Sequence, residues 1–535
     1  MKKEIINTIK DALISLKYPS VDISIEKPKN KDHGDISSNI ALLLTKQLKK
    51  NPMEIAENLK TILDKSILFE SVKIASPGFI NFKFKAESIV DHINRIIKLG
   101  DDYGKNNSGK NKKILVEFVS ANPTGPLTVG HGRGAIIGDT ISNILIWNGF
   151  NVDREYYYNN AGRQMRLLGE SLKARCYELL NKKYTFPEDG YKGSYIIDIA
   201  KKINSIYDDK ITSKNDVFFK DEAEKYIFKD INATLDNLGL KFDSYFNENT
   251  LYENKNIYRV IGKLKDKNLI YEKDGATWFK ATSLGLNTDR VLIKKTGEPT
   301  YRLPDIAYHE TKFERGYDTC IDVFGADHMD AYPDVLAALN QLGFDDKNVK
   351  VLIHQFVSIV KDGEITKMST REGNFTTLSQ LINDIGSDVV RYFFIMRSMN
   401  SHLNFDLELA KQKSSDNPVY YIQYAHARIC TILSKNNISN NVNLGLLIEN
   451  EEIQLIHKLI EFEELIIKLK DKLEPQILAN YLFDLATLFH KYYAQHKIIN
   501  DDINITNARL KLIKSIKIAL KNGLNILGIS HPERM

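Results

Sequence analysis

The 535-residue sequence has little cysteine, no long apolar run and almost no net charge. Its cysteines, Cys176, Cys320 and Cys430, are far apart and form no CxxC pair, which argues against a disulfide framework or a cysteine-based zinc site. No apolar stretch approaches the ~20 residues that a membrane helix needs, so no membrane association is expected. The first twenty residues lack the pattern of a signal peptide, because Asp11 and Lys17 interrupt their apolar positions. A reducing, cytoplasmic location is therefore expected.

The net charge of +5, from 74 basic and 69 acidic residues, is too small to indicate nucleic-acid binding by itself. The charge is uneven, however. Residues 1–50 hold ten lysines and six acids, and residues 501–535 hold six basic residues and three acids. Basic ends are typical of a protein that binds a polyanion through its terminal regions. They are equally compatible with ordinary solvent-exposed helix faces.

The order of predicted elements divides the chain into three parts. Residues 1–85 contain helical patterns and two short strands around a Pro-Gly turn, which predicts an N-terminal α+β domain. Residues 110–400 alternate strands and helices, with insertions expected over about 170–270. Residues 405–535 are helical almost throughout, which predicts an all-α helical-bundle domain. In its last helix, over 508–522, Gly523 is expected to be the C-terminal cap.

The middle part opens with the apolar run 114–119, broken only by Glu117, then a loop and a helix over 134–147. A run without alternation is typical of a buried parallel strand. Strand, loop and helix in this order open a doubly wound parallel-sheet, Rossmann-like α/β domain.

The loop after that strand reads Ser-Ala-Asn-Pro-Thr-Gly-Pro-Leu-Thr-Val-Gly-His-Gly-Arg from Ser120 to Arg133. It would lie at the carboxyl end of the strand, where α/β sheets bind ligands. Its glycines allow close backbone approach, and His131 and Arg133 place cationic donors beside a helix N-terminus, which itself favours phosphate. Taken alone, the loop is equally compatible with a Gly/Pro-rich turn and a solvated histidine.

A second polar loop covers residues 360–374 and contains Lys367, Met368, Ser369 and Arg371. Such a loop could close over a triphosphate. Its two cations could then stabilise the negative charge on the departing pyrophosphate. The alternative for this segment alone is a solvated basic hairpin.

Together the two loops resemble the His-x-Gly-His signature and the KMSKS loop of class I aminoacyl-tRNA synthetases. The wider strings are similar to those of the arginyl-tRNA synthetase family, in order and over nearly the whole chain. These strings cover residues 33–36, 76–81, 120–127, 155–164, 301–308, 323–328, 417–428 and 523–535. Two positions depart from the pattern. Thr128 stands where the first signature histidine is usual, and Thr370 stands where the second lysine is usual, so Arg371 is expected to compensate.

The resemblance implies that ATP, with Mg²⁺, activates L-arginine, and that the arginyl group then passes to the 3′-terminal adenosine of tRNA(Arg). A monomer is expected, without a resident metal site. Thr128, His131, Lys367 and Arg371 are the expected catalytic residues. The expected ATP-binding residues are Pro123, Gly125, Gly130, His131, Arg133, Lys367, Met368 and Ser369.

An arginine-binding site needs particular side chains, because a buried guanidinium requires planar hydrogen-bond acceptors such as carboxylates. The expected arginine-binding residues are Glu117, Ser120, Asn122, Tyr301, Asp305 and His328, with Asp327 as an alternative to His328. Glu117 and Asp305 would pair with the guanidinium, and Tyr301 would stack on it. The alternatives are a surface charge on an edge strand for Glu117 and a helix N-cap for Asp305.

The helical C-terminal part is implied to bind the anticodon, and residues 1–85 the elbow of the tRNA. The expected tRNA-binding residues are Tyr420, Tyr421, Tyr424 and Arg428, which fall at near-helical spacing, and Met535. Aromatic side chains on an exposed helix can stack unpaired bases, at ~1–3 kcal/mol each. The alternative is that at least two of these tyrosines belong to the core.

Three rival functions stay open at this point. A synthetase for another amino acid, such as cysteine, would be expected to show zinc-type ligands. A small-molecule nucleotidylyltransferase would not need a helical C-terminal domain of this size. A catalytically silent tRNA-binding paralogue would be compatible with the changes at Thr128 and Thr370.

Overall fold

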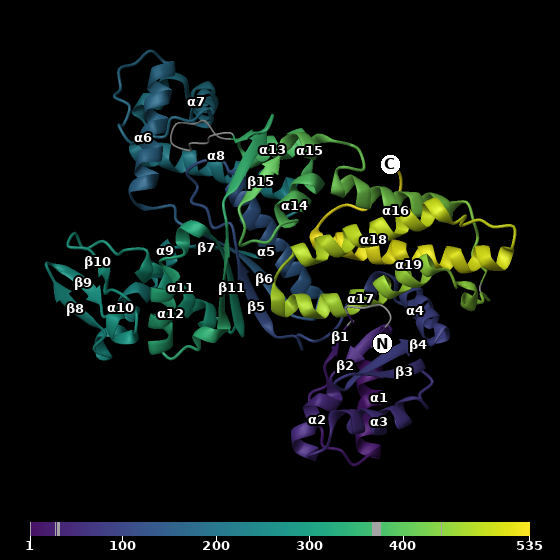
Figure 1. Cartoon of the computed structure of the whole chain (residues 1–535). Helices are drawn as coiled ribbons and strands as arrows, with labels where there is room; N and C mark the ends of the chain where they lie inside the picture. Colours follow the sequence, from purple (N-terminus) through teal and green to yellow (C-terminus); the bar gives the residue numbers. More distant parts are fainter. Residues whose placement is uncertain (1, 27, 29–32, 366–375, 440) are drawn as a thin grey trace.

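The computed structural model describes residues 2–26, 28, 33–365, 376–439 and 441–535, with side chains in these ranges except those of 2, 3, 86–90 and 328. Figure 1 shows three parts: an N-terminal unit in purple, a central sheet with its helices, and a helical bundle that ends in yellow. The central sheet lies between the bundle and two groups of helices, α6–α8 and α9–α12.

The N-terminal unit packs helices on a four-stranded antiparallel sheet with the order β1-β2-β4-β3. Asn51 starts one of the helices by accepting the Met53 N–H, with Pro52 in the first turn, as the sequence predicts. Ile80 and Phe82 are fully buried. The elements are α1 (Lys2–Ser15), β1 (Ile25–Glu26), β2 (Ile36–Ser38), α2 (Ile40–Leu48), α3 (Pro52–Leu63), β3 (Phe69–Ala75) and β4 (Phe79–Phe84), and α4 (Ala86–Leu99) then leads to the bundle.

A five-stranded parallel sheet forms the centre, with the order β12-β11-β5-β6-β7. The chain moves from β5 to β6 on one side and later returns to β11 on the other, so the strand order reverses beside β5. Ligands bind at such a switch point, outside the carboxyl ends of the strands. The strands are β5 (Lys113–Glu117), β6 (Asn151–Tyr158), β7 (Ser244–Asn247), β11 (Thr319–Gly325) and β12 (Val349–His354).

Helix α5 (Val129–Trp147) follows β5 and is buried on nearly all sides, between the sheet and the bundle. It begins at Val129, five residues before the predicted start, because Thr128 caps it. The remaining helices of this part are α6 (Gly162–Leu179), α7 (Ser194–Tyr207), α8 (Asp216–Asn237), α9 (Asn249–Glu253), α10 (Asn256–Asp266), α11 (Arg302–Glu314), α12 (Tyr332–Gln341), α13 (Leu378–Ile385) and α14 (Ser387–Ile395).

Residues 170–270 contain more than inserted helices, because β7 is the fifth strand of the central sheet. Two further strands, over 276–279 and 290–293, lie outside that sheet. They form a separate antiparallel sheet with the order β10-β9-β8. Its strands are β8 (Ile270–Lys273), β9 (Ala276–Phe279) and β10 (Arg290–Ile293), and a third small sheet joins β13 (Val357–Lys361), β14 (Glu364–Ile365) and β15 (Leu403–Asp406).

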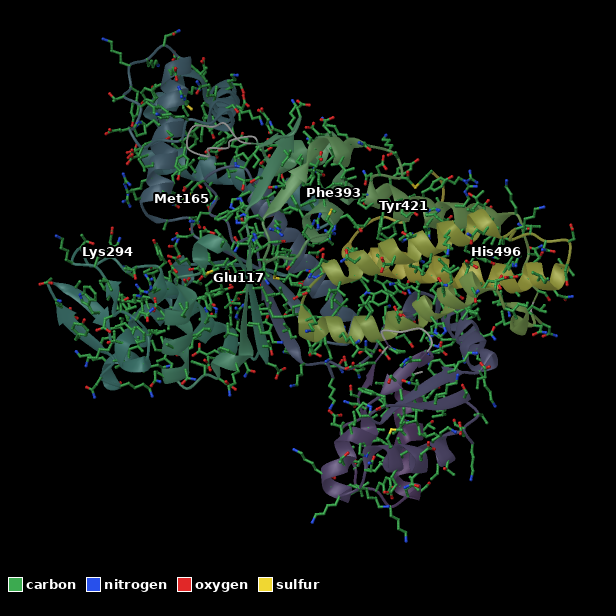
Figure 2. All side chains as sticks on the ribbon, in the orientation of Figure 1. Glu117, Met165, Lys294, Phe393, Tyr421 and His496 are labelled. Carbon is green, nitrogen blue, oxygen red and sulfur yellow. The ribbon has the colours of Figure 1, made fainter. Side chains whose placement is uncertain are left out.

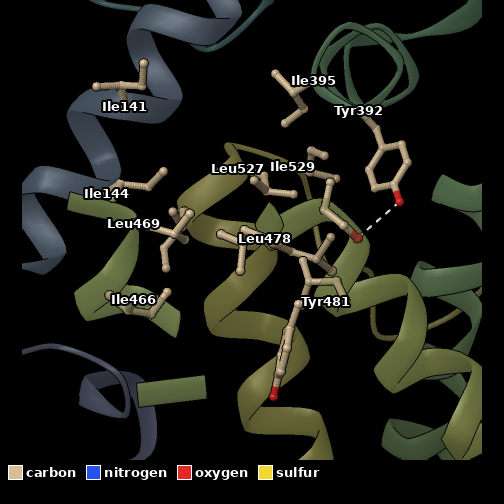
Figure 3. Close-up of a cluster of buried hydrophobic side chains, with 14 of the residues drawn as sticks. Ile141, Ile144, Tyr392, Ile395, Ile466, Leu469, Leu478, Tyr481, Leu527 and Ile529 are labelled. Carbon is tan, nitrogen blue, oxygen red and sulfur yellow. Dashed lines mark hydrogen bonds between the residues drawn. The ribbon is translucent and has the colours of Figure 1, made fainter. Parts of the chain in front are cut away.

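The C-terminal part is helical from α15 (Leu407–Lys411) through α16 (Pro418–Ser434), α17 (Asn450–Lys472), α18 (Gln476–Gln495) and α19 (Ile503–Leu527). Its apolar core continues into the central part: in Figure 3, Ile141 and Ile144 of α5 face Leu469 and Leu478 of the bundle. The Tyr392 hydroxyl of α14 donates to the Ala479 carbonyl at 3.2 Å.

Gly523 does not cap the last helix, so that prediction is wrong. It lies inside α19, where an added Cβ would collide with Leu482, and the cap is Gly528 at φ +67°. Among the helices that the structure describes, none is both long enough and apolar enough to cross a membrane.

Candidate functional site

The loop after β5 leaves the strand in an unusual backbone conformation. Val119 and Ser120 both have positive φ, at 68° and 43°, which is strained for residues with a side chain. The Ser120 hydroxyl holds the turn, since it donates to Glu117 Oε1 at 2.9 Å and accepts the Tyr157 N–H at 3.3 Å. Strain of this kind is frequent at ligand-binding loops.

Thr128 and His131 lock the start of α5 as a reciprocal capping box. The Thr128 hydroxyl accepts the His131 N–H at 3.5 Å, and His131 Nδ1 accepts the Thr128 N–H at 3.1 Å. Because Nδ1 accepts, the proton of the neutral ring is on Nε2. Burial lowers the pKa of His131 below 6.5. The ring is therefore a neutral donor at pH 7, not the cationic donor predicted from the sequence.

The other residues of this loop leave room at the helix N-terminus. At Gly130 an added Cβ would meet only the Thr128 hydroxyl, at 3.6 Å. Pro123 is buried, and Gly125 lies against the ring of Tyr195. Asn122 accepts the Asn159 N–H at 3.0 Å and donates to Gln164 at 3.2 Å, so its amide ties this loop to the end of β6. Among the described residues, Thr128 alone would lie within 4 Å of a Cβ at Gly130, so no other side chain covers this face of the helix N-terminus.

Arg133 does not fit its predicted role as an ATP ligand. It is fully buried, and its guanidinium donates to the backbone carbonyls of Gln355, Ser398 and Ser401 at 2.8–2.9 Å. Burial lowers its pKa to about 10, which still leaves it charged at neutral pH. The side chain fastens α5 to the segments after β12 and α14, and none of its bonds is directed at a nucleotide.

Glu117 is buried in the central strand, so the surface-charge alternative is wrong. Figure 2 shows it in the middle of the molecule. Its carboxylate is already occupied, since Lys312 Nζ lies 2.6 Å from Oε2 and Ser120 donates to Oε1. The same ammonium lies 2.6 Å from Asp322 Oδ1. This pairing is an obstacle to the predicted contact between Glu117 and the guanidinium of a substrate.

Two nearby carboxylates pair with no cation among the described side chains. Asp305 is in the first turn of α11, and its carboxylate has no hydrogen-bond partner there; burial raises its pKa to about 7. Glu248 follows β7 directly and accepts bonds from the Tyr157 hydroxyl at 2.8 Å and the Asn159 amide at 2.9 Å. Burial raises its pKa as well. Tyr157 lies beside both carboxylates.

Glu248 is not predicted from the sequence. It directly follows β7, at the sheet edge where ligands bind, but that strand lies in the range that is predicted to hold insertions. Asp305 does not cap α11, whose N-cap position is Tyr301, so that alternative is wrong. The Tyr301 side chain is 75% exposed. Tyr157 lies close to both carboxylates, and the Tyr252 hydroxyl is hydrogen-bonded to Glu248.

Several predicted site residues lie outside the described residues: Lys367, Met368, Ser369, Thr370, Arg371 and the side chain of His328. Asp327, the alternative to His328, lies close enough to His131 and His354 to raise the pKa of both rings, against the larger lowering by burial. In the described ranges, no three His, Cys, Asp or Glu side chains gather in a way that could hold a metal ion.

The predicted tRNA-binding residues form two kinds of contact on α16. Tyr420 and Tyr424 stack with ring centroids 6.2 Å apart, and Arg428 lies over the Tyr424 ring at 5.2 Å. All three side chains are partly exposed. Tyr421 instead packs against the core and on His490, 4.4 Å away. One of the three tyrosines is therefore packed inward, and Met535 is 50% exposed at the end of the chain.

A parallel sheet that reverses its order beside a capped, glycine-rich helix N-terminus defines a nucleotide-using α/β enzyme. The family model of the catalytic domain of class I (R) tRNA synthetases matches residues 92–392. The arginyl tRNA synthetase N-terminal domain matches residues 3–84, and the DALR anticodon binding domain matches 422–535.

The particular family follows from the relatives. The chain is 47% identical to the arginine–tRNA ligase of Desulfotalea psychrophila, over 96% of this chain and 94% of the relative. It is 46% identical to that of Salinibacter ruber, with 96% of each chain covered. The solved arginyl-tRNA synthetase of Thermus thermophilus has the same fold, with a TM-score of 0.79 at 20% identity and full coverage of both chains. The chain belongs to the arginyl-tRNA synthetase family.

Proposed function

We propose that this protein is an arginine–tRNA ligase that works in two steps at the carboxyl edge of the central sheet. The carboxylate of L-arginine attacks the α-phosphate of ATP, which gives arginyl-adenylate and releases pyrophosphate. A ribose hydroxyl of the terminal adenosine of tRNA(Arg) then attacks the arginyl carbonyl and releases AMP. Membership of the family and of class I supports this reaction.

The observation that carries the choice of arginine is the pair Asp305 and Glu248. Two half-buried carboxylates without a cation among the described side chains are costly, and their raised pKa values express that cost. A guanidinium would relieve it, since its planar N–H groups can donate to both carboxylates at once. The compact ammonium of lysine cannot offer the same fork of donors and would leave an acceptor unpaired. In this proposal Asn122 orients the backbone end of the substrate, and Ser120 supports the loop.

ATP would bind at the start of α5. Gly130 leaves space for the nucleotide, and the first N–H groups of α5 can donate to phosphate. His131 Nε2–H donates to a phosphate oxygen, while Thr128 acts indirectly by holding that ring. Lys367 and Arg371 are proposed to stabilise the departing pyrophosphate, as the sequence predicts. Mg²⁺ is proposed to accompany ATP, because it is usually held by substrate phosphates with one or two carboxylates.

The tRNA is proposed to contact the exposed aromatic face of α16, namely Tyr420, Tyr424 and Arg428, and residues 1–85. Stacked, half-exposed rings beside a guanidinium can stack on unpaired bases of the tRNA. The proposed active unit is a monomer.

ATP–pyrophosphate exchange with each amino acid, with and without bulk tRNA, tests the proposed function. We expect exchange with arginine and with no other amino acid. Exchange with a different amino acid would contradict the guanidinium assignment. Intact tRNA binding without any exchange would favour a catalytically silent paralogue.

A further inference from the structure

The loop between β5 and α5 is held at three points by three different parts of the chain. Three of its carbonyl oxygens, spaced three residues apart, each accept a hydrogen bond of 2.8 Å. The donors are the Tyr156 hydroxyl of β6 for Ala121, the Tyr195 hydroxyl of α7 for Thr124, and the Leu378 N–H of α13 for Leu127. The backbone conformation of the loop therefore depends on the sheet, on the inserted helices α6–α8 and on α13 together.

Tyr195 lies in the first turn of α7, and its ring is fitted between two glycines. An added Cβ at Gly125, in the loop, would lie 3.1 Å from the Tyr195 hydroxyl oxygen. An added Cβ at Gly193, the N-cap position of α7, would collide with the ring itself. Both positions thus leave room for this one ring, and close packing around a ring fixes the direction in which its hydroxyl points.

The inserted helices reach the middle of the loop through this hydroxyl. Figure 1 shows α6, α7 and α8 as a group of their own beside the central sheet, and they pack on one another. A cavity of about 190 Å³ lies between them and the loop, lined by Pro126 on the loop side and by residues of α7 and α8 on the other. Tyr195 lines the same cavity, and its hydrogen bond to Thr124 bridges the two sides.

The two ends of the functional part of the loop have anchors of their own. The Asn122 amide oxygen accepts a backbone N–H after β6 at 3.0 Å, and His131 is held by the capping box at the start of α5. In the proposed function Asn122 orients arginine and His131 donates to ATP. The segment between them therefore sets the distance between the two substrates, and the bond from Tyr195 to Thr124 lies within that segment.

We propose that Tyr195 is a positioning residue for adenylate formation. Its hydroxyl holds the Thr124 carbonyl and thereby sets the placement of arginine relative to ATP. This inference rests on the proposed function of the site. Tyr195 touches neither substrate and acts through the loop, so the inserted helices take part in the first step of the reaction.

Loss of this bond should affect the rate of the first step more than the binding of either substrate. Each substrate keeps its own contacts in the ground state, whereas attack on the α-phosphate needs the carboxylate and the phosphorus atom aligned at short distance. A misplacement of about 1 Å costs about 100-fold in rate. We therefore expect a fall in kcat without a matching rise in KM.

Tyr195→Phe removes the hydroxyl and keeps the ring between its two glycines. In ATP–pyrophosphate exchange with tRNA saturating, kcat should fall about 10- to 100-fold, while KM for arginine and KM for ATP stay within about twofold. Tyr177→Phe is the matched control, because the Tyr177 hydroxyl of α6 donates to the Thr212 carbonyl at 3.2 Å, within the inserted segment itself. It should lower the unfolding temperature as Tyr195→Phe does and leave kcat unchanged.

Gly193→Ala tests the same bond without changing its donor. Gly193 has φ −59°, which alanine adopts freely, so the added methyl group acts by displacing the Tyr195 ring. The value of kcat should fall here too. The double variant with Tyr195→Phe should lose no more than the larger of the two single losses, because both changes break one bond. Additive losses, or an unchanged kcat in both single variants, would overturn the inference.

The remaining outcomes separate this inference from the proposed function. An unmodified enzyme without any exchange would refute the function and the inference together. Exchange with a different amino acid that still falls in Tyr195→Phe would refute the choice of arginine and support the positioning role. A rise of more than about tenfold in KM for ATP in Tyr195→Phe, at unchanged kcat, would mean that the hydroxyl contributes to nucleotide binding, and would overturn the role given to Tyr195.

Discussion

The guanidinium of Arg391 donates from Nε to the carbonyl of Leu527 at 2.8 Å and thereby ties α14 to the last turn of α19. The same side chain is fully buried, pairs with Asp139 of α5 and donates to the Leu238 carbonyl at the end of α8 at 2.9 Å. One side chain therefore joins the C-terminal bundle, the helix that starts at the proposed nucleotide site, and the inserted helices.

Gly528→Ala should weaken this junction. The residue has φ +67°, and an added Cβ would collide with the Arg391 guanidinium. We expect a loss of about 2–4 kcal/mol, from left-handed strain and overpacking together. Gly297→Ala is the matched control, because Gly297 has φ +83° with no atom near its missing Cβ, and it should lose only about 1–2 kcal/mol. Denaturant unfolding measures both, and equal losses would contradict a clash with Arg391.

Arg133→Met tests whether Arg133 binds ATP, as the sequence predicts, or holds α5 in place through three backbone carbonyls, as the structure shows. Three backbone carbonyls would lose their donor, and buried unsatisfied acceptors cost about 1–3 kcal/mol each. We therefore expect a clear fall in thermal stability. At a temperature where the variant is folded, KM for ATP in the exchange reaction should stay within about twofold of the unmodified value. A large rise in KM for ATP at unchanged stability would restore the nucleotide-binding role.

The order of the elements could be predicted from the sequence, because it depends on local patterns. The apolar run around Glu117 gives a buried strand, and the Gly/Pro-rich loop that follows it lies at the carboxyl end of that strand. The role of this loop in ATP binding and that of Asp305 in guanidinium binding stay predictions.

The contacts that the sequence does not reveal join residues that are distant along the chain. Nothing near Glu117 indicates that Lys312, 195 residues later, occupies its carboxylate. Arg133 looks like a phosphate ligand until the carbonyls of 398 and 401 fold around it. Gly523 looks like a cap because a glycine ends many helices, whereas here it makes room for Leu482. Which residue pairs with which depends on how the chain packs, and a local sequence pattern carries no information about that packing.

Thr128→Ala should lower both stability and the rate of adenylate formation. Loss of an N-cap hydroxyl costs about 1 kcal/mol, and the His131 ring would lose the Thr128 hydroxyl that lies 3.2 Å from its Nδ1, while it keeps the bond from the Thr128 N–H. Thr128→Ser keeps the hydroxyl and should preserve the rate in ATP–pyrophosphate exchange. A rate in Thr128→Ala equal to that of Thr128→Ser would show that the capping box does not orient the histidine.

His426 should make the bundle sensitive to acid. It is fully buried, one ring nitrogen donates to the Pro532 carbonyl at 2.9 Å, and burial lowers its pKa from 6.5 to about 4. The unfolded chain takes up the proton first, so this stability is present above pH 6.5 and lost as the pH falls towards 4. The loss amounts to about 3 kcal/mol at most. His426→Asn should show a shallower fall of the unfolding free energy over this range, and an identical slope would contradict the assignment.

Tyr424→Ala and Tyr421→Ala should have opposite signatures, although the two residues are one helical turn apart. Tyr424 is half-exposed between Tyr420 and Arg428, so its loss should weaken tRNA binding by about 1–3 kcal/mol with little change in stability. Tyr421 packs on Phe483 and His490, so its loss should leave a cavity and lower the unfolding temperature. Filter binding of tRNA and thermal unfolding of both variants provide the comparison. Unchanged tRNA affinity in folded Tyr424→Ala would mean that the exposed rings of α16 are not part of the tRNA interface.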